Sequence, residues 1–199
     1  APAFNSPPVS IQTASNLRHM LLRLFTAISL PDHVLDRLIL LEGDLYGASW
    51  RDRDALHLTL AFYGDLDHAA ARELDAELAG IRAAPLTLSL DGIGWFGRRE
   101  PTAVWAGVAP NAELRQLAHA CERAGRRLGI DMPRRPYRPH VTLAYCRGTS
   151  LTQVGAYHNG MREFRTEPFE VGQFELYSSH QTKSQNRYDE EATYLLGDC

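Results

Sequence analysis

The sequence has little cysteine, no long apolar run and no strong excess of charge of either sign. Its 199 residues include three scattered cysteines, Cys121, Cys146 and Cys199, and no CxxC pair. Such spacing excludes a disulfide framework and does not indicate zinc, so reduced thiols in the cytoplasm are expected. No stretch approaches the roughly 18 consecutive apolar residues of a membrane helix, and no association with a membrane is expected.

The net charge limits the kinds of partner that the protein can attract. A formal net charge of -3 provides no global attraction for nucleic acid, so any polyanion site has to rest on a local basic patch. The first 18 residues are rich in Pro, Ser and Ala and lack the basic and apolar regions of a signal peptide. We expect a disordered extension over residues 1–18, followed by one domain over residues 19–199.

The rest of the chain alternates apolar segments of strand character with helical patterns. Strands are expected at 19–29, 55–64, 86–96, 102–108, 140–147, 169–179 and 191–197, and helices at 31–45, 68–84, 111–130 and 151–161. The polar stretch 178–191 is expected to be an exposed hairpin or a loop near the functional cleft, with Lys183 and Arg187 as further candidates for substrate contact.

The order strand, helix, strand, helix, strand occurs twice, over about 20–96 and 102–177. The middle strand of each copy carries nearly the same pentapeptide, HLTLA at 57–61 and HVTLA at 140–144, with the histidines 83 residues apart. A repeat of this length indicates a duplicated, two-lobed domain and not a solenoid. The five residues between the copies are too few to separate them, so the copies are expected to pack as one unit.

The paired motif has a direct chemical interpretation. Side chains alternate along a strand, so His57 shares a face with Thr59, and His140 shares a face with Thr142. If the copies pack about a pseudo-two-fold axis, both faces line one cleft. One neutral imidazole then removes a proton from a nucleophile, and the other, protonated, donates to a leaving oxygen. Threonine hydroxyls donate to phosphate oxygens, and no metal or other cofactor is required.

A single strand histidine is more often a hydrogen-bonded structural residue, and the duplication is what argues for function. In these contexts the chain resembles the two-histidine phosphoesterase superfamily, specifically the bacterial and archaeal RNA 2',3'-cyclic phosphodiesterases formerly named 2'-5' RNA ligases. The stretches that carry the resemblance are LRLFTAISLP, LHLTLAFYGDL, GWFGRREPTAVWAGV and RPYRPHVTLAYCR, so it covers most of the chain from about residue 20.

The resemblance implies an α+β fold in which two pseudo-two-fold-related copies form antiparallel sheets around a central cleft, with helices outside. It implies metal-independent hydrolysis of RNA 2',3'-cyclic phosphate ends to a 2'-phosphate, with reversible 2'-5' ligation as a related activity. His57 resembles the general acid and His140 the general base. Thr59 and Thr142 would hold phosphate oxygens, and Phe62 resembles the aromatic that stacks on the terminal base.

One position departs from the family pattern. The family has an arginine five residues after the second histidine, where this chain has Tyr145. Arg147 from the next step of the strand, the Tyr145 hydroxyl, or an upstream arginine such as Arg138 are the alternatives for holding the phosphate. Arg134 and Arg138 are also candidates for a basic rim along an RNA backbone, together with Arg135.

The expected partner is an RNA end bearing a 2',3'-cyclic phosphate, such as a tRNA fragment, bound by a monomer. Two alternatives stay open on the residues alone. One is a module that binds RNA ends with little catalysis, because the arginine is displaced. The other is a phosphodiesterase that acts on small cyclic nucleotides.

Overall fold

The computed structural model describes residues 21–181 and 186–197. The extension expected over residues 1–18 and the candidate Lys183 lie outside the described residues. The strands are β1 (Leu22–Ser29), β2 (Ala48–Trp50), β3 (His57–Leu66), β4 (Leu86–Leu88), β5 (Leu90–Phe96), β6 (Ala103–Val108), β7 (His140–Cys146), β8 (Phe169–Val171), β9 (Gln173–Gln181) and β10 (Asn186–Leu195). The helices are α1 (Asp32–Ile39), α2 (His68–Ala79), α3 (Ala112–Arg127) and α4 (Leu151–Gly160), with a 3-10 turn at Arg53–Ala55.

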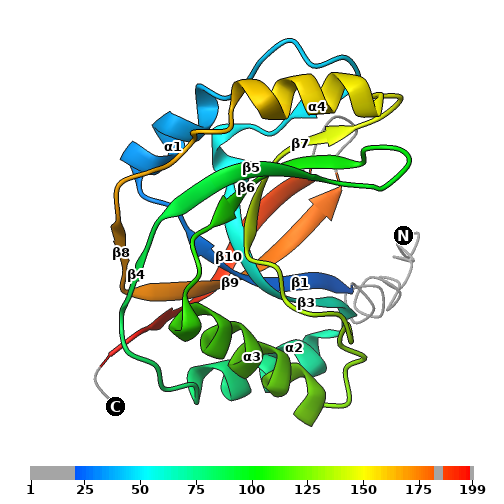
Figure 1. The fold of residues 1–199 in the computed structure, drawn as a ribbon. Helices are drawn as coiled ribbons and strands as arrows, with labels where there is room; N and C mark the ends of the chain where they lie inside the picture. Colours follow the sequence, from blue (N-terminus) through cyan, green and yellow to red (C-terminus); the bar gives the residue numbers. More distant parts are fainter. Residues whose placement is uncertain (1–20, 182–185, 198–199) are drawn as a thin grey trace, which may run out of the picture.

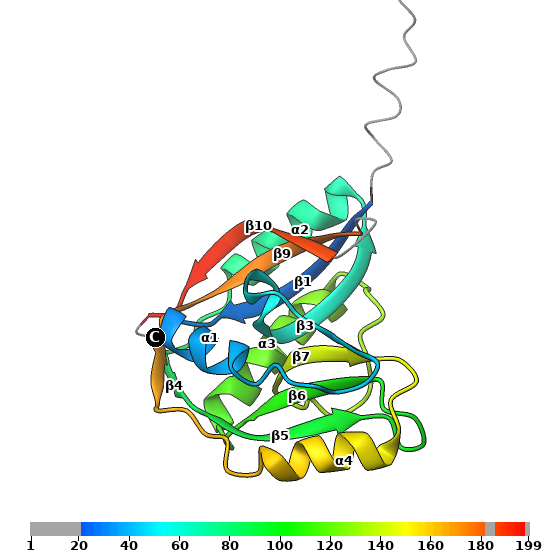
Figure 2. The ribbon, with the colours of Figure 1, turned by 90° about the horizontal axis from the view of Figure 1, so that it is seen from above.

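An antiparallel sheet of eight strands forms the centre of the molecule. Its order is β10-β9-β1-β3-β7-β6-β5, and β2 pairs with β7 as a side branch. The strands follow this order across the view in Figure 2. The two halves of the sheet meet between β3 and β7, where Leu58 and Val141 are the one recorded pair of partners. The α+β, two-lobed antiparallel architecture is thus the one predicted.

The two sequence copies are interlocked. The spacing of 83 residues between the histidines recurs between β4 and β8 and between the first residues of β5 and β9. However, β5 of the first copy pairs with β6 of the second, and β9 of the second pairs with β1 of the first. The chain crosses between the halves where β4 pairs with β8 in a separate two-stranded sheet. Each half of the central sheet therefore contains strands from both copies.

Helices cover the outside of both halves (Figure 1). Helices α2 and α3 lie together beneath β1 and β3, and α4 runs along β5 on the opposite side of the molecule. Asn111 caps α3 by accepting a hydrogen bond from Leu114 N at 2.6 Å, which satisfies a free donor of the first turn. The apolar face of α3, including Leu114, Leu117 and Cys121, is fully buried, and this burial fixes the helix against the sheet.

Three element boundaries differ from the predicted ones. The strand expected at 86–96 is two strands, because β4 pairs with β8 and β5 pairs with β6. The helix expected over 31–45 ends at Ile39, since the chain has to turn for β2 to pair with β7. All described residues of the polar stretch 178–191 belong to β9 and β10, which pair antiparallel as the expected hairpin would, but β10 begins at Asn186 and not at 191. The polar residues of β10 suit a strand at the sheet edge. Among the described residues, no helix combines the length and apolarity needed to span a membrane.

Candidate active site

The junction of β3 and β7 brings the two HxT motifs together. Leu58 and Val141 are antiparallel partners, and both are fully buried on the face away from the histidines. Continuing this register by one residue in each direction sets His57 opposite Thr142 and Thr59 opposite His140. The local two-fold axis thus passes through the Leu58–Val141 pair, and each histidine faces the threonine of the other copy.

Each motif strand contains a β-bulge at the same position. Along β1, Ala27 pairs with Thr59 and Thr26 with Ala61, so Leu60 is the extra residue. Along β6, Trp105 pairs with Thr142 and Val104 with Ala144, so Leu143 is the extra residue. A bulge shifts the alternation of side chains by one residue.

The bulges place one further aromatic side chain of each strand on the histidine side. In an unbroken strand, the residue five positions after a histidine would point to the opposite face. Instead Phe62 is 39% exposed and Tyr145 is 48% exposed, whereas Ala61 and Ala144 are buried. Phe62 and Tyr145 are therefore equivalent residues of the two copies, next to the two motifs.

The backbone orients both imidazole rings in the same way. Nδ1 of His140 lies 2.7 Å from the carbonyl oxygen of Arg138, two residues earlier. The carbonyl of Ala55, also two residues earlier, is the corresponding partner of His57. A carbonyl oxygen only accepts, so the ring nitrogen at each contact carries the proton. The second ring nitrogen remains as the atom that exchanges protons with a ligand.

Aromatic rings enclose His57. Its ring centroid lies 4.9 Å from that of Phe25, 5.1 Å from that of Tyr188 in an edge-on contact, and 6.4 Å from that of Tyr177. Burial lowers the pKa of His57 from 6.5 to about 4, and the charges of Arg51 and His140 act in the same direction. The pairing of Leu58 with Val141 places the two motifs on neighbouring strands, which accounts for the small effect of His140 on the pKa of His57.

His140 has a more open environment. Phe96 contacts its ring edge-on at 4.9 Å, and the Trp105 ring lies at 6.1 Å. Burial lowers the pKa of His140 below its ordinary value, the hydrogen bond to Arg138 opposes this, and the charge of Arg135 lowers the pKa further. Near neutral pH both imidazoles are thus uncharged in the unliganded protein, and a bound anion would raise both pKa values.

A cleft of about 610 Å³ opens beside His140. It is lined on one side by Thr59 and Phe62 of β3, and on the other by His140 with Arg135 and Arg138 of the preceding segment. The threonine of one motif and the histidine of the other therefore face a single space. Besides aromatic, hydroxyl and guanidinium groups, the lining contains the Glu122 carboxylate, which forms an ion pair with Arg126. The volume and the aromatic and guanidinium groups suit a nucleotide.

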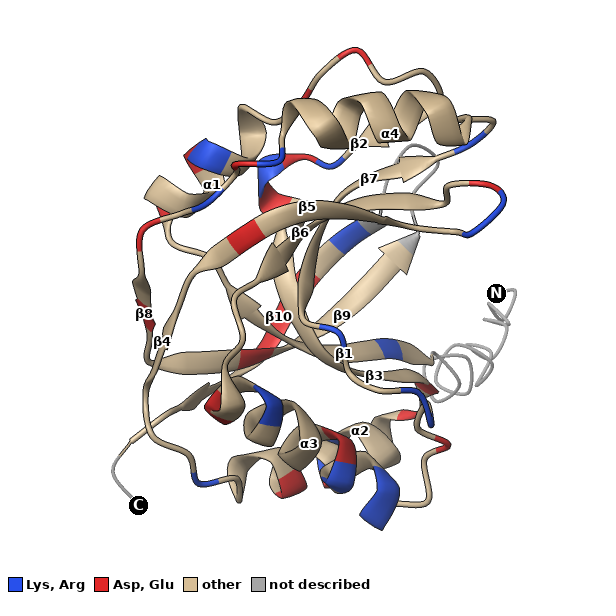
Figure 3. Ribbon diagram, in the orientation of Figure 1, with Lys and Arg blue, Asp and Glu red and all other residues tan. Residues whose placement is uncertain are grey.

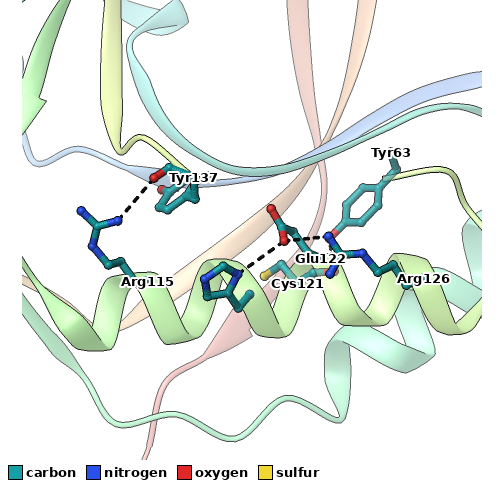
Figure 4. Close-up of polar contacts among 7 residues, drawn as sticks. Tyr63, Arg115, Cys121, Glu122, Arg126 and Tyr137 are labelled. Atoms are coloured by element: carbon teal, nitrogen blue, oxygen red, sulfur yellow. Dashed lines mark hydrogen bonds and ion pairs between the residues drawn. The ribbon is translucent and has the colours of Figure 1, made fainter. Parts of the chain in front are cut away.

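The segment before β7 is held in place from two sides. The Tyr137 hydroxyl donates to the Thr59 carbonyl at 2.9 Å, and Arg115 of α3 donates to the Tyr137 carbonyl at 3.4 Å. Figure 4 shows this second contact toward one end of α3. Further along the helix, the Tyr63 hydroxyl donates to the Cys121 carbonyl at 3.2 Å and ties β3 to α3. These bonds fix the cleft wall that carries Arg135 and Arg138.

The remaining candidates lie in different places. Arg134 is exposed and outside the lining of the cleft, and Arg147 is exposed just after β7. The arginine that acts electrostatically on His57 is Arg51, which sequence analysis missed. No local pattern marks Arg51, because the pairing of β2 with β7 that places it is long-range. Acidic and basic residues are interspersed over the whole fold (Figure 3), so the local groups at the cleft set its charge.

The fold and the site define a two-histidine phosphoesterase. A family model described as the 2'-5' RNA ligase superfamily matches residues 31–183, and the chain belongs to that superfamily. The chain is 30% identical over 180 residues to an RNA 2',3'-cyclic phosphodiesterase of Escherichia coli K12, which covers 83% of this chain and 92% of the relative.

Two further comparisons agree. An RNA 2',3'-cyclic phosphodiesterase of Geobacillus stearothermophilus is 33% identical over 127 residues, which cover 60% of this chain and only 40% of the relative. The chain therefore spans less than half the length of that relative. The crystal structure of E. coli LigT complexed with 3'-AMP superposes with a TM-score of 0.75 at 28% identity, over 89% of this chain and 99% of LigT.

Proposed function

We propose that the protein hydrolyses RNA 2',3'-cyclic phosphate ends to 2'-phosphates by acid–base catalysis with His57 and His140. The observation that carries this proposal is the meeting of the two HxT strands at the Leu58–Val141 pair, beside a cleft that Thr59 and His140 line together. The activity named for the curated relatives supports it.

In this reaction a water molecule attacks phosphorus while the neutral imidazole of His140 takes its proton. The bond from phosphorus to the ribose O3' breaks, and O3' takes the proton carried by His57, which leaves the phosphate on O2'. Hydrogen bonds from the hydroxyls of Thr59 and Thr142 stabilise the non-bridging oxygens as negative charge develops on them. With a ribose hydroxyl in place of water, the same groups support 2'-5' ligation.

The cleft supports the assignment of the remaining groups. Phe62 is a partly exposed ring that lines the same cleft as His140, where the terminal base would stack. Arg138 lines the cleft, and Arg134, four residues earlier in the same segment, is exposed outside it. An RNA backbone that leaves the cleft along this segment would meet both arginines. We extend the proposal to a cytoplasmic monomer that acts on RNA fragments such as those of tRNA, and light scattering of the purified protein tests the monomer.

The test compares the parent with His57→Ala and His140→Ala on an oligonucleotide with a 2',3'-cyclic phosphate end. We expect turnover in EDTA, a 2'-phosphate product, and a loss of at least about 100-fold in kcat/KM for each variant. Unchanged thermal unfolding shows that the fold is intact. Full activity in either folded variant contradicts the proposal. A mononucleotide 2',3'-cyclic phosphate, assayed in parallel, shows whether small cyclic nucleotides are the better substrates.

A further inference from the structure

Arg51 is fixed beside the second motif by the backbone. It directly follows β2, which pairs with β7, and its N–H donates to the carbonyl of Leu143 at 2.8 Å. Leu143 is the bulged residue of β7, next to Thr142. Arg51 therefore continues the pairing of β2 along the motif strand, although it lies 92 residues before Leu143 in the sequence.

Two tyrosines hold the guanidinium group. One of its terminal nitrogens donates to the Tyr188 hydroxyl at 3.0 Å. Its central carbon lies 5.5 Å from the centroid of the Tyr145 ring and 5.6 Å from that of Tyr188. A planar guanidinium suits such contacts, which orient it without consuming all five of its donors.

The charge of Arg51 is not balanced by a carboxylate. Within the described parts of the chain, no Asp or Glu oxygen lies within 4.0 Å of its side-chain nitrogens, whereas Arg53, two residues later, forms ion pairs with Asp32 and Asp36. Arg51 is partly buried, and burying an uncompensated charge is costly. An anion that binds next to it would remove this cost.

The location identifies the anion. Tyr188, which accepts the hydrogen bond from Arg51, contacts the His57 ring edge-on at 5.1 Å. Arg51 also acts electrostatically on His57, whereas Arg135, which lines the cleft, acts on His140. Arg51 is not part of the lining of the cleft beside His140, and its side chain is linked to the motifs through Tyr188, which contacts His57. An unbalanced guanidinium this close to His57 is a candidate for binding an anion there.

We propose that Arg51 is the phosphate-binding arginine of this enzyme, supplied from the end of β2 and held against Tyr145 and Tyr188. This inference rests on the proposed function and assigns a residue to it. Tyr145 occupies the position of β7 at which the family has an arginine. In this chain the Tyr145 ring instead orients the guanidinium of Arg51. The guanidinium donates to the non-bridging oxygens and offsets the charge that develops on them as water attacks.

The experiment replaces Arg51 by glutamine, which removes the charge but retains a donor for the Tyr188 hydroxyl. We expect kcat/KM for the cyclic phosphate to fall by about 100-fold or more. Binding of adenosine 2'-monophosphate, measured by calorimetry at fixed ionic strength, should weaken at least about 10-fold. The matched control is Arg82→Met, which removes an exposed guanidinium bonded to carbonyls in the loop after α2, and it should leave both quantities unchanged.

A second variant returns the charge to β7. In Arg51→Gln with Tyr145→Arg, the guanidinium starts from the neighbouring strand, and we expect it to recover at least about 10-fold of the lost kcat/KM. A merely structural role for Arg51 predicts no such recovery. The single variant should also move the acidic limb of the pH profile of kcat/KM upward, because the charge of Arg51 contributes to the low pKa of His57.

The outcomes separate this inference from the proposed function. If folded Arg51→Gln retains at least half of the parent's kcat/KM and affinity, Arg51 does not bind the phosphate. A loss in Arg147→Met without one in Arg51→Gln overturns the assignment in favour of Arg147. If the parent itself shows no turnover, the proposed function fails, and the nucleotide titration alone decides on Arg51. If Arg51→Gln does not fold, Arg51→Lys takes its place. If that variant binds adenosine 2'-monophosphate as tightly as the parent, the proposal that the guanidinium of Arg51 binds the phosphate is contradicted.

Discussion

At the scale of single residues, the duplicated motif creates two histidines with the same backbone partner but different surroundings. Phe25, Tyr177 and Tyr188 enclose His57, whereas His140 faces the open cleft. The sequence alone makes the two strands chemically alike. Their difference comes from β9 and β10, which pair onto the first half of the sheet from more than 100 residues away.

The lowered pKa values predict the pH dependence of catalysis. The active form carries one proton on the pair, so kcat/KM should follow a bell whose limbs are the two pKa values of the free enzyme. The limbs are macroscopic pKa values of the pair: the lower one reflects the pKa of about 4 for His57, and the upper one the lowered pKa of His140. Because His57 is the proposed acid and has the lower pKa, the productive form with its proton on His57 is the minor one-proton form in the free enzyme. At pH values below the lower limb both histidines are protonated and no base remains. At pH values above the upper limb both are neutral and no acid remains. We expect the maximum of kcat/KM below pH 6.5.

The profile of kcat provides the internal control for this prediction. A bound phosphate anion raises the pKa of both imidazoles, so the bell for kcat should lie at higher pH than the bell for kcat/KM. Steady-state rates from pH 3.5 to 9 at constant ionic strength measure both. A maximum of kcat/KM above pH 7 would be inconsistent with the enclosure of His57 described above.

At the scale of elements, the bulges show where sequence patterns stop being informative. The alternation within HLTLA and HVTLA predicts that each histidine shares a face with its threonine. It does not predict that Phe62 and Tyr145 join that face, because the bulges at Leu60 and Leu143 depend on the register against β1 and β6. The placement of Arg51 depends on a three-residue strand for the same reason, since so short a strand leaves almost no periodic signal.

The packing of β5 on β6 supports the second motif and can be tested separately. The Trp105 ring lies directly over Gly94, where an added Cβ would come within 2.9 Å of the ring carbon Cε2. Trp105 pairs with Thr142 and lies near His140, so a displaced ring disturbs the site. We expect Gly94→Ala to lower the free energy of unfolding by about 1–3 kcal/mol and to reduce turnover.

Denaturant unfolding measures this effect, and Gly155→Ala in α4 is the matched control. A Cβ at Gly155 meets no atom within 4 Å, so alanine there should stabilise the helix by up to about 1 kcal/mol. Equal changes in the free energy of unfolding for the two substitutions would show that the packing of the Trp105 ring does not require a glycine at position 94.

At the scale of the whole molecule, the duplication predicted two lobes but not how they interlock. The copies exchange their last strands, and the exchange is visible only in pairings such as β5 with β6 and β9 with β1. Local sequence does not specify the pairing of β9 with β1, because it joins segments from opposite ends of the domain. The two-fold repeat therefore predicted two related motif strands, which do pair with each other, but not the topology of the sheet around them.

Interlocked copies predict cooperative unfolding. All three tryptophans, Trp50, Trp95 and Trp105, lie on β2, β5 and β6, in the half of the sheet around β7, so their fluorescence reports on that half. Far-UV circular dichroism reports on both halves. We expect both signals to change at the same denaturant concentration, since neither half has a complete set of strands from one copy. Two separate midpoints would indicate that the halves unfold independently.

The exchange of strands also sets an order for biosynthesis. The ribosome releases β1 and His57 early, yet the strand that pairs with the free edge of β1 is β9, and the ring that closes over His57 belongs to β10. Until these last strands emerge, β1 has an unpaired edge and His57 lacks two of its three aromatic neighbours. The first of the two motif histidines to be made is thus the last to be enclosed, so the proposed catalytic pair is complete only after β10 has emerged.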